Sequence, residues 1–190
     1  MPAADDLIQT PAEQAALTRL RELAGTTDGP MERHCVRCFT LAEEVARRKQ
    51  LDIDREVLLV AAFFHDAALY LDGTQRHAAY VTDSRVFATE IGEAHGWDAA
   101  RITRCADTIE RHHEPTPQWS YGNEVELLRR ADLMELVPPS APLVGLDLGF
   151  LRGLWRRVPR KGLYGHIAML VTADVRRAGP GVLPGIFLPR

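Results

Sequence analysis

Apolar residues recur at helical spacing along most of this chain. Residues 10–13 form a helix start: a threonine cap, a proline at the first helical position and a glutamate suited to a capping box. The first apolar stripe follows this start and ends at Gly25. A second helix begins near Pro30, and its inward stripe includes His34 among apolar residues. The pattern predicts amphipathic helices that pack their apolar faces together.

A third helix is predicted after Asp54, which is a suitable cap. Its run VLLVAAFF is apolar on nearly every face and continues into His65-Asp66, so we expect a central helix that carries this polar doublet in its interior. Periodicity alone also allows a buried strand over residues 57–64. The alanine-rich continuation and the lack of alternating segments elsewhere favour the helix.

The remaining pattern is also helical. It predicts helices at residues 84–95, from Asp98 to about 113, from Asn123 to the prolines at 138–139, at 148–157 and at 163–177. The Gly- and Pro-rich tail that follows carries apolar residues that are costly to leave in water, so we expect it to pack as an extended strap. With no internal repeat and no linker, the sequence predicts one all-α domain, a helical bundle spanning 1–190.

The composition, 46% hydrophobic and 26% charged, is that of a globular protein. A net charge of −3 argues against binding to a nucleic-acid polymer, which requires a basic surface. The longest apolar run is too short to span a membrane, and the first residues lack the features of a signal peptide. Three cysteines, a small odd number, favour a reducing compartment. We therefore expect a cytoplasmic protein that acts on a small molecule, and a homo-oligomer is compatible with the sequence.

Polar side chains interrupt the apolar stripes of four predicted helices: His34, His65-Asp66, His113 and Asp132. A carboxylate inside an apolar helix is costly without a compensating charge, and no Lys or Arg lies within one helical turn of Asp66. Helical bundles build metal sites by pointing such side chains inward from several helices. The sequence therefore predicts a site for one divalent transition metal, and imidazoles with carboxylates suit Mn²⁺, Fe²⁺, Zn²⁺, Ni²⁺ or Co²⁺.

The order His34, His65-Asp66, Asp132 resembles the HD-domain superfamily of metal-dependent phosphohydrolases. The resemblance extends to the surrounding segments HCVRCFTLAEEVA, LLVAAFFHDAALY and LLRRADLMEL, and covers about residues 30–137. It implies an all-α bundle with one or two divalent metals that hydrolyses phosphomonoesters or phosphodiesters, often of nucleotides. By this resemblance His34, His65, Asp66 and Asp132 are metal ligands, and Asp66 would bridge two metals where two bind.

The chain departs from the members of this superfamily that bind two metals, because those members have further histidines between the doublet and the last aspartate. His112-His113 resembles one of these positions. The other is expected where this sequence has Tyr80 and Ser84, and His77 is out of register. We therefore expect one metal rather than two, with His112 or His113 as an outer ligand or a substrate contact.

A second departure concerns the acid. Several nucleotidases of the superfamily place a glutamate three residues after the HD aspartate, where this chain has Leu69. Acid–base catalysis then falls to His113, Asp72 or Glu114, in that order, because a histidine titrates nearest to neutral pH. We take Asp66 and His113 as the catalytic residues.

A phosphorylated substrate needs cations to hold it. Arg37, one turn beyond His34, is the first choice for this contact, and Lys161 is the second. Arg130 and the other basic residues near Lys161 are further candidates, namely Arg156, Arg157 and Arg160.

The spacing of Cys35 and Cys38 is that of redox and zinc pairs. Redox pairs of this kind lie at a helix N-terminus, where the thiol pKa is lowered, whereas this pair lies inside the predicted helix. No second pair is present to complete a zinc ribbon. We interpret both residues as small buried thiols.

These features predict a metal-dependent hydrolase of a small phosphorylated substrate, a nucleotide or a related phosphomonoester. One alternative on the same scaffold is a mononuclear-zinc hydratase or hydrolase of a small nitrile-like or amide substrate, and another is a di-iron oxygenase. The missing histidine near Tyr80 argues against two irons. A third alternative is a non-catalytic nucleotide-binding sensor, although the presence of all four ligands weighs against it.

Overall fold

The computed structural model describes residues 4–71, 80–138 and 145–178, and every regular element in these ranges is helical, which confirms the all-α prediction. In chain order the elements are α1 (Ala4–Leu7), α2 (Pro11–Ala24), α3 (Pro30–Lys49), α4 (Arg55–Phe64), the 3-10 helix η1 (Ala67–Tyr70), α5 (Tyr80–Ala94), α6 (Ala99–Glu110), the 3-10 helix η2 (Trp119–Tyr121), α7 (Asn123–Leu136), α8 (Leu148–Arg157) and α9 (Leu163–Ala178).

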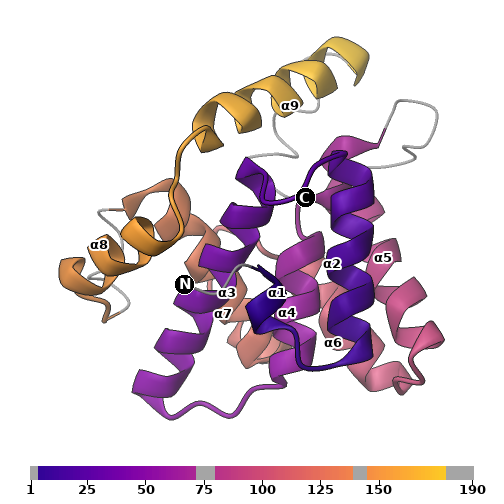
Figure 1. Cartoon of the computed structure of the whole chain (residues 1–190). Helices are drawn as coiled ribbons and strands as arrows, with labels where there is room; N and C mark the ends of the chain where they lie inside the picture. The colour runs from indigo at the N-terminus through magenta and orange to yellow at the C-terminus, as the bar shows by residue number, and fades with distance from the viewer. Residues whose placement is uncertain (1–3, 72–79, 139–144, 179–190) are drawn as a thin grey trace.

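Helix α4 is the centre of the bundle (Figure 1). Every residue from Val57 to Phe64 is buried, as its apolar run predicts, and α2, α3, α5, α6 and α7 all contact it. Burying a Leu or Phe side chain contributes roughly 1.5–3 kcal/mol, so this run anchors the fold. The alternative of a buried strand at residues 57–64 is wrong.

The start of α2 is formed as the sequence predicts. Thr10 caps the helix, its side chain accepts from the Glu13 backbone N–H, and the Glu13 carboxylate accepts from the Thr10 backbone N–H in return. Gly25 ends the helix with φ 63°, in the left-handed region that favours glycine. Glu13 is buried and also receives a hydrogen bond from Arg55 at 2.6 Å, which ties the start of α2 to the start of α4.

Two helix pairs position the candidate site. Helix α3 packs along α7, and α5 packs along α6. The first pair brings His34 close to Asp132, which is far from it in the sequence. In the described ranges no helix is long and apolar enough to cross a membrane.

The last two helices lie along one side of the bundle, drawn in orange and yellow in Figure 1. The predicted bounds of α8 and α9 agree with the structure, and α9 contacts α3 and η1. Helix α5 begins at Tyr80, earlier than the sequence pattern predicts. The tail expected to form a strap lies outside the described residues, and the single domain over residues 1–190 stays a prediction.

Candidate metal centre

The polar doublet lies at the end of α4 and not in a helix interior, which corrects the sequence prediction. The α-helix ends at Phe64, His65 is its C-cap, and Asp66 has φ −112° and ψ 5°, outside the α-helical region. A 3-10 helix, η1, follows directly, and its Ala68 N–H donates to the Ser84 hydroxyl on α5 at 3.0 Å. The apolar segment therefore continues, but in a tighter helix that begins at the doublet.

The predicted ligands His34, His65, Asp66 and Asp132 converge in the interior. His34 Nε2 lies 3.2 Å from His65 Nε2 and 3.2 Å from Asp132 Oδ1. Asp66 Oδ2 lies 3.5 Å from His65 Nε2 and 4.0 Å from His34 Nε2. All four residues are buried, and they come from α3, α7 and the turn after α4.

Hydrogen bonds on the far side of the rings fix the orientation of three histidines. His65 Nδ1 lies 2.8 Å from the Ala62 carbonyl oxygen, and His112 Nδ1 lies 2.6 Å from the Ile109 carbonyl oxygen. Since a carbonyl only accepts, both Nδ1 atoms carry hydrogen. His34 Nδ1 faces the Glu135 carboxylate at 3.5 Å in the same way. With each Nδ1 engaged in this way, Nε2 points toward the carboxylates, where its lone pair would bind a metal ion, as in metal-ligating histidines.

Two buried atoms in this cluster have no hydrogen-bond partner among the described residues, Asp66 Oδ1 and His112 Nε2. They face each other at 3.6 Å. Burial would lower the pKa of His112, but the carboxylates of Asp66 and Asp132 outweigh it and raise that pKa. The local field therefore favours a positive charge between these side chains, and the donor set fits a divalent metal.

The described residues offer three overlapping groups for such an ion. They are His34, Cys38, His65 and Asp132; His65, Asp66 and His112; and His112, His113 and Asp132. His112 thus joins the four predicted ligands as a member of two groups. The overlap allows more than one metal position, so a single metal stays a prediction.

Cys38 belongs to the first group because its Sγ lies 3.6 Å from His34 Nε2. Burial raises its pKa to about 11, so without a metal it is a thiol. Cys35, Cys38 and Cys105 are all buried and form no disulfide, which for Cys35 and Cys38 agrees with their interpretation as small buried thiols.

Glu135, which the sequence pattern did not single out, fixes the surroundings of His34. Its fully buried carboxylate accepts from Arg37 Nε at 2.5 Å and from Trp155 Nε1 at 3.3 Å, and Arg160 Nε lies at 3.1 Å. Arg37 is itself fully buried and also donates to the Pro159 carbonyl at 2.9 Å. The arginine expected to bind substrate is therefore engaged in orienting Glu135, and through it His34.

A cavity of about 430 Å³ adjoins this cluster. Asp66, His112 and Asp132 line it and so connect it to the metal ligands. The other lining residues are Leu69, Tyr80, His113, Glu114, Pro115, Arg129, Leu133, Leu136, Val137, Ile167 and Val171.

Tyr80 and His113 form a pair on the wall of this cavity. The Tyr80 hydroxyl lies 2.5 Å from His113 Nε2, and His113 Nδ1 lies 3.8 Å from Asp132 Oδ2. Burial lowers the pKa of His113 to about 4, so the free imidazole is neutral. Of the two residues where a family histidine is expected, Tyr80 is therefore hydrogen-bonded to His113, and Ser84 accepts from the Ala68 N–H.

The other predicted cations do not line the cavity. Lys161 is exposed, and its carbonyl accepts from Arg33. Arg130 donates to Glu126 at 2.5 Å and lies over the Trp119 ring. Of the three acid–base candidates, His113 and Glu114 line the cavity, whereas Asp72 lies outside the described residues, as does His77.

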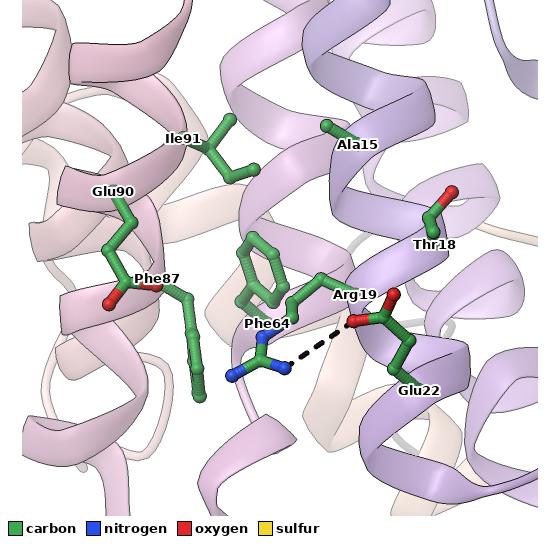
Figure 2. Close-up of a pocket in the computed structure, with 8 residues that line it drawn as sticks. All are labelled: Ala15, Thr18, Arg19, Glu22, Phe64, Phe87, Glu90 and Ile91. Carbon is green, nitrogen blue, oxygen red and sulfur yellow. Dashed lines mark hydrogen bonds and ion pairs between the residues drawn. The ribbon is translucent and has the colours of Figure 1, made fainter.

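A second hollow of about 340 Å³ lies between α2 and α5 (Figure 2). Its charged residues Arg19 and Glu22 pair with each other at 3.4 Å, and the Arg19 guanidinium lies over the Phe87 ring. Its lining contains none of the residues of the three metal groups. The cavity beside Asp66 is therefore the candidate active site.

Comparison with known families agrees with this geometry. The model of the HD domain matches residues 31–136, more than half of the chain, and includes every ligand described above. Comparison with curated proteins gave no match. The chain belongs to the HD-domain family, and with its buried His/Asp cluster it is a member of the superfamily of metal-dependent phosphohydrolases.

Proposed function

We propose that this protein hydrolyses a small phosphomonoester in the cavity beside Asp66. The observation that carries the proposal is that the cavity is continuous with the metal groups: Asp66, His112 and Asp132 belong to these groups and also line the cavity. A substrate in the cavity would therefore reach the metal centre directly. The family supplies the reaction class, and we assign the substrate from the cavity.

His34, His65, Asp66 and Asp132 would hold the metal, with His112 as a further ligand. A divalent ion held there would supply positive charge that polarises a phosphoryl oxygen and acidifies water. The chain contributes the orientation of the ligands. Glu135 and the Ala62 carbonyl fix the rings of His34 and His65, so each Nε2 faces the site before any ion binds.

The Tyr80–His113 pair is our assignment for proton transfer to the leaving oxygen. With a neutral ring, His113 Nε2 accepts from the Tyr80 hydroxyl, and the Nδ1 hydrogen faces Asp132. Both exchangeable protons lie at the wall of the cavity. This replaces the glutamate of several nucleotidases of the superfamily, whose position is occupied by Leu69.

The test begins with protein purified without added metal, whose metal content is measured. It is then loaded with Mn²⁺, Fe²⁺, Zn²⁺, Ni²⁺ or Co²⁺ and assayed for phosphate release from phosphomonoesters, including nucleoside monophosphates and sugar phosphates. We expect release with at least one metal, and loss of both metal and activity in His65→Ala. His95→Ala, at an exposed position, is the matched control. If the loaded protein releases no phosphate from any of these esters, the proposal is wrong.

A second candidate, hydration of a small nitrile-like molecule, is favoured by one observation. Among the described residues the one cation that lines the cavity is Arg129, and it is paired with Glu126. An uncharged substrate needs no cation beside the metal. The same metal-loaded protein incubated with simple nitriles and cyanamides distinguishes the two: amide or urea products without phosphatase activity would favour the hydratase.

A further inference from the structure

We propose that the substrate carries an apolar body, an aryl or branched alkyl group, and that α9 provides part of the surface that selects it. This inference rests on the proposed function, because it names the part of the phosphomonoester that lies away from the metal.

The lining of the cavity is the first support. Aliphatic side chains from three separate parts of the chain face it: Leu69 from η1, Leu133 and Leu136 from α7 with its C-cap Val137, and Ile167 and Val171 from α9. The polar lining residues are those of the metal groups together with Tyr80, Glu114 and Arg129. A ligand that fills about 430 Å³ here therefore meets the metal groups with its polar part and aliphatic carbon with the rest.

Charge is the second support. Arg129 uses all three guanidinium nitrogens: Nε and Nη2 donate to the Glu126 carboxylate at 2.8 Å each, and Nη1 donates to the Glu114 carbonyl at 3.2 Å. Recognition of a polyphosphate requires several free cations or backbone donors. Among the described lining residues Arg129 is the only Lys or Arg, and its guanidinium is already engaged, so the lining favours a ligand with a single phosphate at the metal.

Exposed apolar surface is the third support. Leu133 is 46% exposed and Val137 is 49% exposed, and both line the cavity that Asp66, His112 and Asp132 also line. Large apolar side chains that remain exposed in a concave site are suited to covering an apolar ligand.

Helix α9 lies outside the part of the chain that the HD-domain model matches, residues 31–136. Ile167 and Val171 are one helical turn apart and half-buried, so they present one face of α9 to the cavity. The metal ligands thus come from the matched segment, whereas part of the substrate wall comes from an element that follows it.

The experiment compares ligands that share a phosphoryl group and differ in their body. Binding of phenylphosphonate and methylphosphonate to the full, metal-loaded chain is measured by calorimetry, and kcat and KM are measured for 1-naphthyl phosphate and a nucleoside monophosphate. Ile167→Asn places an amide in the wall, Ile167→Ala enlarges it, and Val86→Asn is the control, since Val86 is exposed on α5 and does not line the cavity. Metal content and unfolding temperature are recorded for every variant.

We expect phenylphosphonate to bind at least ~10-fold more tightly than methylphosphonate, because a hydrophobic pocket discriminates by about tenfold or more per missing group. Ile167→Asn should remove most of this difference in binding and raise KM for 1-naphthyl phosphate, with metal content unchanged. Ile167→Ala should lower KM for 1-naphthyl phosphate, because it enlarges the cavity. Val86→Asn should change neither value.

Two failures are distinguishable. If the protein cleaves the nucleoside monophosphate as efficiently as the naphthyl ester, and Ile167→Asn has no effect, the inference is overturned while the phosphatase proposal holds. If no ester is cleaved but phenylphosphonate binding depends on Ile167, the apolar subsite stands and the phosphatase proposal falls. Equal binding of both phosphonates also overturns the inference.

Discussion

Glu135 connects the metal ligands to the rest of the bundle, because one buried carboxylate faces both His34 and Arg37. We predict that Glu135→Gln weakens metal binding by about 10–100-fold, the usual effect of removing a residue that orients a ligating histidine. It should also lower the free energy of unfolding by roughly 3–5 kcal/mol, since Arg37 stays buried without its carboxylate. Metal titration and urea denaturation measure the two effects.

Glu93→Gln is the matched control for this substitution, because Glu93 is exposed on α5 and its change should alter neither quantity. Metal affinity that is unchanged in Glu135→Gln would show that His34 does not depend on this carboxylate for its orientation.

The Tyr80 hydroxyl is the second prediction at the scale of single residues. Tyr80→Phe removes the hydrogen bond to His113 Nε2 and keeps the ring in place. We expect kcat to fall by about 10–100-fold, within the usual contribution of a positioned acid or base, while metal content stays the same. A variant with full kcat would remove Tyr80 from the proposed proton path, and a variant that loses its metal would assign the hydroxyl to the ligand shell instead.

The ends of the elements mark the limit of what the sequence can predict. The run after Phe64, AALYL, has the same apolar character in an α-helix and in a 3-10 helix, so periodicity cannot place the change at His65-Asp66. Similarly, α5 extends back to Tyr80, one helical turn before the start that the sequence pattern predicts at Ser84. In contrast, the cap at Thr10 and the stop at Gly25 are local chemistry, and both were predictable.

The residues of the candidate site also fall into those that the sequence predicts and those that it does not. His34 and Asp132 were predictable because each is a polar residue on an otherwise apolar helix stripe. In the sequence, Glu135 resembles any acidic residue near the end of a helix. Its burial depends on Arg37 and Trp155, which belong to other elements. The sequence also could not show that Arg37, predicted as a substrate contact, is buried against Glu135, because tertiary packing decides which arginines are exposed.

The junction of α2 with α4 gives a prediction at the scale of elements. Glu13 completes the capping box of α2 and pairs with Arg55 in α4, and its side chain is buried. We expect Glu13→Ala to lower the free energy of unfolding by roughly 3–5 kcal/mol, because a buried charge pair loses one partner. Metal affinity should stay unchanged, since Glu13 belongs to none of the metal groups. Thermal denaturation measures the first effect and metal titration the second.

For this prediction Glu22→Ala, in the same helix but at an exposed position, is the control. A stability loss in Glu13→Ala no larger than in Glu22→Ala would show that the junction does not hold the two helices together.

At the scale of the whole molecule, the buried ligand cluster makes stability depend on metal. An ion that binds the folded chain alone adds RT ln(1 + [M]/Kd) to the free energy of unfolding, or about 2.7 kcal/mol at a hundredfold excess over Kd. For a chain of this size that is roughly 5–10 °C in unfolding temperature. We predict that a chelator removes this increase and that His65→Ala never shows it, while His95→Ala behaves as the unmodified chain.

The same measurement counts the metals. Well above Kd, each ion released on unfolding adds about 1.4 kcal/mol to the free energy of unfolding for every tenfold rise in free metal. One metal therefore gives a slope of about 1.4 kcal/mol per tenfold, and two metals give about 2.7. We predict the smaller slope, because this chain has Tyr80 and Ser84 where two-metal members have a further histidine, and the Tyr80 hydroxyl is bound to His113. The larger slope would mean that the overlapping groups around His112 hold a second ion and that the prediction of one metal is wrong.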